Sequence, residues 1–182
     1  MKKSVIAIVE TQIQAERIVD QLQQGGLASA DISVLFPDKR SGKDFAHEHN
    51  TKAPEGAVAG ISAGGVIGGT LGLLAGIGAL AIPGVGPLIA AGPIMATLSG
   101  AAAGAAVGGI AGGLIGLGVP EFEAKSYEGK VRGGNILIAV HTDNGETEKR
   151  AKQVFEHNGA HDIAVTSDAS VPNKKREHIS QF

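Results

Sequence analysis

The chain contains no cysteine among its 182 residues, and charge of either sign is missing from Gly56 to Pro120. Without cysteine, disulfides, thiolate metal sites and cysteine nucleophiles are excluded. Outside the uncharged stretch the two signs nearly balance, with seven basic and eight acidic residues in 1–55 and nine and ten in 121–182. Neither part has the basic excess typical of nucleic-acid binding, so we expect no nucleic-acid partner.

Lysine is missing between Lys52 and Lys125, which rules out a Walker phosphate-binding loop although glycine is abundant there. The spacing Gly76-x-Gly78-x-x-Ala81 is of the dinucleotide-binding type, but it follows no expected strand. We also expect no export signal, because the apolar run that follows Ser4 is only five residues long. We therefore expect no cofactor, and we expect the charged parts of the chain to stay in the cytoplasm.

Glycine dominates the uncharged stretch, which holds 20 of the chain's 28 glycines between Gly56 and Gly118. Most of them recur every fourth residue, in one series before position 80 and another after position 99. Between the series, Ile82-Pro83-Gly84-Val85-Gly86-Pro87 cannot continue a helix and predicts a reversal of the chain. We expect two helices, over about 57–82 and 94–119, joined by this turn.

Such helices need a special setting, because each interior glycine costs roughly 0.8–1.0 kcal/mol relative to alanine in water. Hydrocarbon favours helix for any apolar segment, and a glycine at every fourth residue lets two helices approach closely. At about 1.5 Å per residue, each helix would cross a bilayer core of about 30 Å. This predicts a membrane-inserted glycine-zipper hairpin, packed within or between copies. The predicted packing residues are Gly60, Gly64, Gly68, Gly72 and Gly76 in the first helix and Gly100, Gly104, Gly108, Gly112 and Gly116 in the second.

Some features of the stretch are unusual for membrane helices. Its hydrophobicity is modest, and the aromatic residues of membrane interfaces are missing between Phe45 and Phe122. Ser99–Ala106 consists of small residues only, so we infer that this portion faces protein, which calls for a homo-oligomer. An alternative is a hairpin buried inside a soluble assembly. Basic residues flank the stretch and are missing from its turn, so the positive-inside rule places both termini in the cytoplasm.

The flanks of the stretch contain an internal repeat. The apolar runs Val5–Val9 and Ile136–Val140 predict a matching pair of strands, and Asp31–Phe36 and Asp162–Val165 predict a second pair at the same offset of 131 residues. Apolar residues at helical spacing lie between the strands of each pair. Each flank is therefore expected to form a β-α-β unit.

The first of these helices has a start signal in Thr11, which with Gln14 three residues later matches a capping box. Thr142 holds the equivalent position in the second unit. Two β-α-β units in tandem predict an α+β fold, a ferredoxin-like β-α-β-β-α-β sandwich with the hairpin inserted between its second and third strands. The first and third strands are apolar throughout and are expected to be central, with the second and fourth at the edges.

Helices cover only one face of such a sheet, so its second face needs another cover. Candidates are the segment Pro120–Arg132, another protomer or the base of the hairpin. Glu121 and Glu123 after Pro120 predict a short helix in that segment, ended by Gly133-Gly134. Its expected apolar side comprises Phe122, Tyr127 and Val131.

We divide the chain into four parts. They are the first β-α-β unit with a polar loop (1–55), the hairpin (56–119), the connecting helix with the second unit (120–166) and a disordered tail (167–182).

Residue types that carry catalysis or bind metals are sparse. His47-Glu48-His49 has metal-ligand residue types but lies on a polar loop without further ligands. Gly159 separates His157 from His161, and His141 ends a strand, where a structural or capping role is expected. No serine–histidine–carboxylate set follows from the spacing, so we predict no catalytic residue and no metal site, and a protein that is not an enzyme.

The sequence resembles a bacterial family of heat-induced or general stress proteins, also described as low-temperature-induced, that carries a glycine-zipper hairpin. The resemblance covers about residues 1–165. It implies a stress-related role at the membrane, and some relatives are described as similar to a membrane subunit of a quinol-oxidising respiratory complex. The segments that carry it are Asp44–His49, Thr51–Ala57, Ile82–Pro87, Ala91–Ile94 and Val119–Lys125.

These observations predict a non-enzymatic protein of the bacterial inner membrane that self-associates through its glycine helices and helps to maintain the envelope under stress. Its expected partners are further copies of itself and membrane lipid, with no evident small-molecule substrate. One alternative is an oligomeric pore, in which Ser99–Ala106 lines an opening. Another is a membrane subunit of a quinone-linked respiratory complex.

Overall fold

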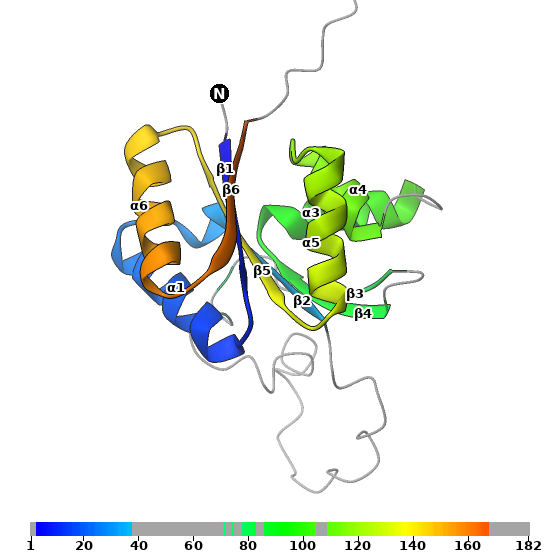
Figure 1. The fold of residues 1–182 in the computed structure, drawn as a ribbon. Coiled ribbons are helices and arrows are strands. Elements are labelled where there is room, and N and C mark those ends of the chain that lie inside the picture. Colours follow the sequence, from blue (N-terminus) through cyan, green and yellow to red (C-terminus); the bar gives the residue numbers. More distant parts are fainter. Residues whose placement is uncertain are drawn as a thin grey trace, which may run out of the picture.

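The computed structural model describes residues 3–37, 71, 74, 78–82, 86–104 and 109–167. The polar loop with His47-Glu48-His49, most of the first expected glycine helix and the tail lie outside these residues. Within them the chain has an α+β fold in which one antiparallel sheet is covered by helices on both faces (Figure 1). None of the described helices combines the length and the apolar character needed to cross a bilayer.

The four strands expected from the internal repeat are present. They are β1 (Lys3–Val9), β2 (Ile32–Pro37), β5 (Ile136–Thr142) and β6 (His161–Ser167). The order of the whole sheet is β3-β4-β2-β5-β1-β6. β1 and β5 pair with each other and each has a further neighbour, which confirms that they are central. β2 was expected at an edge of the sheet, but this is wrong, because β4 pairs with the side of β2 that faces away from β5.

Residues 78–82 and 86–91 form two antiparallel strands, so the helix predicted over 57–82 is wrong at its end, 78–82. β3 (Gly78–Ile82) and β4 (Gly86–Ala91) are antiparallel neighbours. The expected reversal is therefore real, but it joins two strands. Leu88 and Ala90 face one core while Ile89 and Ala91 face the other, so β4 is buried on both sides of the sheet. Pairing with β2 supplies the backbone hydrogen bonds that the membrane helix was expected to provide internally.

The second expected glycine helix, 94–119, is also interrupted. It consists of α3 (Pro93–Gly104) and α4 (Gly109–Gly116). Gly109 has a positive φ of 47°, a conformation that glycine adopts readily and other residues rarely. The chain thus starts a new helix at Gly109, and α4 packs back against α3.

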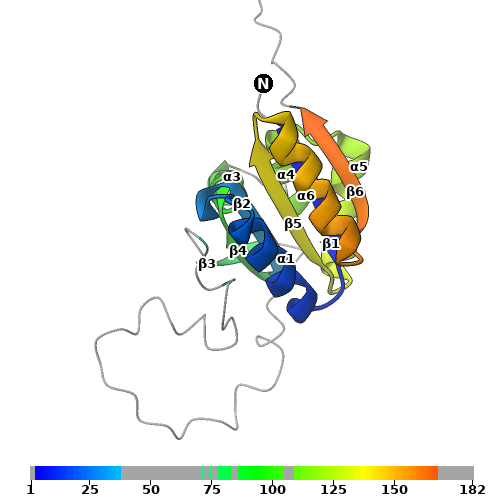
Figure 2. The same cartoon turned by 90° about the vertical axis from the view of Figure 1, so that its left-hand side faces the viewer.

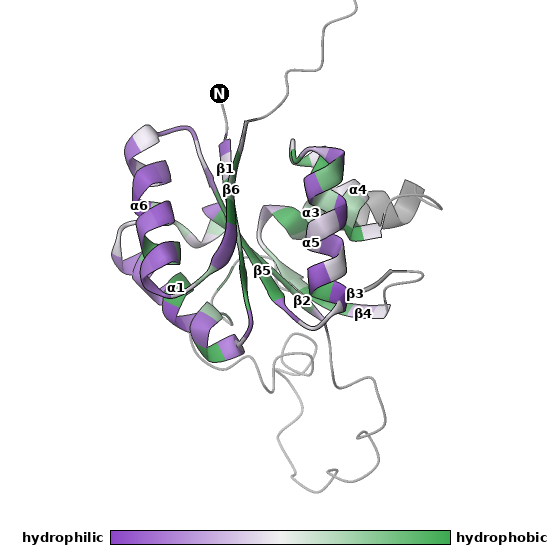
Figure 3. Ribbon diagram, viewed as in Figure 1, coloured by the Kyte–Doolittle hydropathy of each residue, from purple (hydrophilic) through white to green (hydrophobic). Residues whose placement is uncertain are grey.

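Helices α1 (Gln12–Gln24) and α6 (Gly145–His157) cover the first face of the sheet (Figure 2). Thr11 caps α1 as predicted, since the Gln14 amide donates to its Oγ1 at 3.2 Å. The cap of α6 is Asn144, two residues beyond the predicted Thr142. Helix surfaces that face away from the sheet are hydrophilic on this side (Figure 3).

Helices α3, α4 and α5 (Glu121–Arg132) cover the second face. α5 has the predicted bounds, with Gly133 as its C-cap, and it confirms the Pro120–Arg132 segment as one cover of that face. Tyr127 and Val131 are buried as expected, whereas Phe122 is 87% exposed, contrary to expectation. Ala124 takes the third buried position instead.

Candidate functional site

α4 packs closely on α3 at Gly113. A Cβ at Gly113 would lie 2.4 Å from Leu98 Cδ2, so the Leu98 side chain would have to shift to accommodate it. The missing side chain lets α4 approach α3 closely, as small residues do between tightly packed helices. The side of α4 that faces the core also carries Ile110 and Leu114, both fully buried. Close glycine packing therefore occurs here, one position after the predicted Gly112.

The opposite side of α4 is uncovered in the described part of the chain. Gly112, Ile115 and Gly116 lie three and four residues apart, so they share one side of the helix. A Cβ at either glycine would meet no described atom within 4 Å, and Ile115 is 44% exposed. We call this small-apolar-small surface the α4 face.

The surroundings of the other predicted packing glycines are not part of the described structure. Gly100 and Gly104 lie in the second half of α3. Gly60, Gly64, Gly68, Gly72, Gly76 and Gly108 lie outside the described residues. Contact between the two glycine series, within or between copies, therefore stays a prediction.

α5 holds the start of α4 through Glu128. The Ala111 amide donates to Glu128 Oε2 at 2.7 Å, and Arg132 lies 2.5 Å from Glu128 Oε1. A carboxylate at a helix N-terminus satisfies free amide donors and interacts favourably with the helix dipole. Glu128 thus replaces the capping side chain that the glycine-rich sequence before α4 lacks.

A second candidate site lies at the end of the sheet where β5 finishes. The His141 ring contacts two serine hydroxyls, with Nδ1 at 2.9 Å from Ser4 Oγ and Nε2 at 2.8 Å from Ser33 Oγ. The Ile94 amide, in the first turn of α3, donates to Ser33 Oγ at 3.0 Å. The histidine therefore has a structural role, as predicted, and it links β1, β2, β5 and the start of α3.

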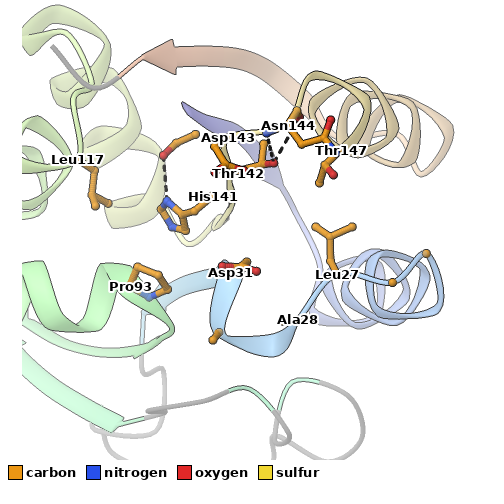
Figure 4. A pocket seen from close by; sticks show the side chains of 14 residues that line it. Leu27, Ala28, Asp31, Pro93, Leu117, His141, Thr142, Asp143, Asn144 and Thr147 are labelled. Atoms are coloured by element: carbon orange, nitrogen blue, oxygen red, sulfur yellow. Dashed lines mark hydrogen bonds between the residues drawn. The ribbon is translucent and has the colours of Figure 1, made fainter. Parts of the chain in front are cut away.

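This His141 cluster borders a cavity of about 690 Å³ (Figure 4). Its wall is made by the loop after α1, the 3₁₀ turn η1 (Ser29–Asp31), the start of α6 and the two ends of the α3–α4 unit. Sequence spacing did not reveal this site, because its polar residues come from strands far apart in the chain. The lining residues are Ser4, Gly25, Gly26, Leu27, Ala28, Ala30, Asp31, Pro93, Leu117, His141, Thr142, Asp143, Asn144 and Thr147.

A third polar cluster joins α5 to β6. The Tyr127 hydroxyl donates to the Asp162 carbonyl at 2.8 Å, and Lys130 forms an ion pair with the Asp162 carboxylate. Hydrogen bonds from Lys130 and then His161 lower the pKa of Asp162. Asp162 has a positive φ of 53°, at the point where the register of β6 on β1 shifts. These contacts fix α5 to the edge of the sheet.

Tyr127 gives a direct test of this packing, because it is the chain's only tyrosine. Burial, and then the negative charges of Glu123 and Asp162, raise its pKa from 10.0 to about 12. We expect tyrosinate absorbance to appear with a midpoint near pH 12 in the folded protein and near pH 10 in denaturant. The Tyr127 pKa is higher in the folded state than in the unfolded state, so the neutral phenol contributes to the free energy of unfolding. This contribution is complete below pH ~10 and is lost as the pH rises from there to ~12. A folded midpoint near 10 would contradict the buried position of α5.

Comparisons of the chain with protein families, with curated proteins and with solved structures give no match.

Proposed function

We propose that this chain is a non-enzymatic protein that self-associates through its glycine-rich helices at the bacterial inner membrane. In this proposal the α4 face contacts the glycine-rich segment of another copy, and the assembly has a structural role in maintaining the envelope. The stress-related part of the role follows from the family resemblance alone.

The α4 face is the observation that carries the proposal. A Cβ at Gly112 or at Gly116 would meet no described atom within 4 Å, and Ile115 and Gly116 are exposed while Gly112 is half-buried. Glycines spaced by four residues allow a second helix to approach to backbone contact, with a large neighbouring side chain filling the space beside it. A water-exposed helix gains nothing from these glycines, since each costs roughly 0.8–1.0 kcal/mol relative to alanine. Close contact with another helix would offset this cost of the two glycines.

We propose that the two β-α-β units form a ferredoxin-like sandwich, to which α4 is attached. In support, β1 and β2 flank β5, and β5 and β6 flank β1, so each β-α-β unit has one strand of the other unit between its own two strands. Such interlocking halves are expected of a β-α-β-β-α-β sandwich. The hairpin β3–β4 and the helices α3 and α4 then form the insertion between its two halves.

Membrane contact is supported by the uncharged stretch from Gly56 to Pro120 and by the basic residues that flank it. Both terminal units pair strands within one sheet, which is consistent with both lying on the cytoplasmic side. Fractionation of cells tests this part, because a membrane-associated chain pellets with membranes. Recovery of the whole protein in the supernatant at low salt would count against membrane contact but leave self-association open.

Self-association is tested with two glycine-to-leucine variants of the full chain. Gly116 on the α4 face and Gly129 on α5 both have open space at their Cβ positions and both lie in helices. Gly116→Leu should therefore fold but block close helix approach, so light scattering in mild detergent should show loss of the assembly. Gly129→Leu should keep the wild-type mass. Equal masses for wild type and Gly116→Leu would overturn the proposal.

A further inference from the structure

The two Asn-Gly pairs of the chain lie at opposite ends of α6. Asn144 and Gly145 begin the helix, and Asn158 and Gly159 follow its last residue. In such a pair the glycine amide nitrogen can attack the asparagine side-chain carbon and close a cyclic imide, because glycine has no Cβ to hinder the approach. Both pairs have this intrinsic chemistry, so their surroundings in the fold decide whether it takes place.

The first pair is open to solvent, and its attacking amide has no partner. Asn144 and Gly145 are both exposed, and a Cβ at Gly145 would meet no described atom within 4 Å. The Gly145 amide is at the first helical position, where an N–H group has no acceptor within the helix. The described residues offer it no other acceptor. Base and water therefore reach both reacting groups.

Hydrogen bonds at the first pair favour the attack itself. The Glu146 amide donates to Asn144 Oδ1 at 2.9 Å. Negative charge develops on this oxygen when the side-chain carbon is attacked, so the amide stabilises it as a donor in an oxyanion hole does. Thr142 Oγ1 donates to the Asn144 main-chain carbonyl at 3.3 Å (Figure 4). This carbonyl shares the negative charge of the Gly145 amide once that amide has lost its proton.

The second pair is held in an unreactive arrangement. Asn158 Nδ2 donates to Gln21 Oε1 at 2.8 Å and to the Val154 carbonyl at 2.7 Å. The side chain cannot turn toward the glycine without breaking both bonds. The Gly159 amide donates to the Glu156 carbonyl at 3.1 Å, so the attacking group is also engaged.

A donor at the main-chain carbonyl is common to the two pairs. Gln14 Nε2 donates to the Asn158 carbonyl at 2.7 Å, as Thr142 does to that of Asn144. The difference between the pairs therefore lies in the asparagine side chain and the glycine amide, which are free to react only at Asn144 and Gly145.

We propose that Asn144 is a site of spontaneous deamidation, whereas Asn158 is protected by the fold. The Gly145 nitrogen loses its proton to solvent base and bonds to Asn144 Cγ, and the Cγ–Nδ2 bond breaks with release of ammonia. Water then opens the cyclic imide. Opening at Cγ gives aspartate, and opening at the main-chain carbonyl carbon gives isoaspartate, so each conversion consumes a water and releases an ammonia.

The two products differ in their effect on α6. Aspartate caps a helix as well as asparagine does, so α6 keeps its start and gains a negative charge. Isoaspartate lengthens the main chain by a carbon atom, so the cap of α6 is lost. This modification is independent of self-association, because α6 lies on the first face of the sheet and α4 on the second.

Incubation of the full chain at mildly alkaline pH, followed by trypsin digestion and mass spectrometry, tests the proposal. The tryptic peptides 133–149 and 153–174 carry the two pairs separately, and their fragmentation identifies the converted residue. In the folded protein, Asn144 should convert at least about tenfold faster than Asn158, whose hydrogen bonds must break first. In denaturant the two rates should be equal. Equal rates in the folded protein, or conversion of Asn144 in denaturant only, would overturn the proposal.

Variants test the chemistry of the site. Gly145→Ala has open space for its methyl group and should fold, but the methyl group hinders closure of the imide. We expect conversion of Asn144 to slow about tenfold, which corresponds to a barrier higher by about 1.4 kcal/mol. Gly129→Ala, also at an open helical position, is the control and should convert as wild type. An unchanged rate in Gly145→Ala would contradict attack by this amide.

Thr142→Val tests the positioning role of the hydroxyl. Loss of its hydrogen bond to the Asn144 carbonyl should slow conversion in the folded protein about threefold and leave the rate in denaturant unchanged. If Thr142 only held the turn in place, the variant would loosen the turn and convert faster. Faster conversion would therefore contradict the role assigned to Thr142.

Discussion

Gly92→Ala is expected to destabilise the protein by more than about 4 kcal/mol, the range reached only by severe core disruption. Gly92 joins β4 to α3, and a Cβ at this position would lie 2.1 Å from the Ile32 carbonyl oxygen and 3.0 Å from Ser33 Cα. Both are backbone atoms of β2, so no side-chain rotation relieves the collision. The backbone at Gly92 also has a φ of 77°, which alanine adopts with strain.

Gly159→Ala is a control that has the backbone strain of Gly92→Ala without its collision with β2. Gly159 follows α6 and has a similar φ of 69°, but a Cβ there would meet only the flexible Gln14 amide at 3.5 Å. This control should lose about 1–2 kcal/mol, the cost of a left-handed conformation alone. Urea unfolding of the two variants measures the difference. Equal losses would show that β2 and the start of α3 are not in contact as described.

Phe155→Ala is expected to cost about 3–5 kcal/mol, as for other large aromatic side chains removed from a core. Phe155 on α6 is fully buried and is the largest side chain of the core between α1, α6 and the sheet. The substitution leaves a cavity that the strands and α1 cannot fill without moving.

Phe122→Ala is the matched control, because Phe122 on α5 is 87% exposed. Its removal should change the free energy of unfolding by less than about 0.5 kcal/mol. Thermal or urea unfolding of both variants tests the assignment of the two faces. A large loss for Phe122→Ala would mean that other parts of the chain cover α5 at that point.

The sequence patterns that predict the sheet correctly are local ones. The apolar runs Val5–Val9 and Ile136–Val140 coincide with central strands. Alternate side chains of these strands pack into two cores, one on each face of the sheet. The polar and apolar spacing of α1, α5 and α6 also sets their bounds closely, because each helix is amphipathic and buries one side.

The glycine-rich stretch was harder to predict, because its residues have no polar side to give a period. A run such as Gly78–Ile82 is equally apolar as strand or helix, and length favoured a helix. The deciding contact is the pairing of β4 with β2, between residues more than fifty positions apart. The local sequence around Gly78–Ile82 does not predict the pairing of β4 with β2.

The His141 cluster shows the same limit at a site. Ser4 and His141 become partners because β1 and β5 pair in a register that places these two residues opposite each other. Ser33 joins them from β2, and the cavity appears only once α3 and the loop after α1 are in place. The one signal in the sequence is a small polar residue within or beside an otherwise apolar strand.

Self-association through the α4 face is tested most directly by cross-linking, for which the natural absence of cysteine leaves a clean background. In Ile115→Cys the single thiol can form a disulfide only with the same position of another copy, so contact between two α4 faces should give covalent dimers under mild oxidation of native membranes. A cysteine at Ser126, exposed on α5, should leave monomers. Monomers alone for Ile115→Cys, or equal dimer yields for the two positions, would contradict helix contact at this face.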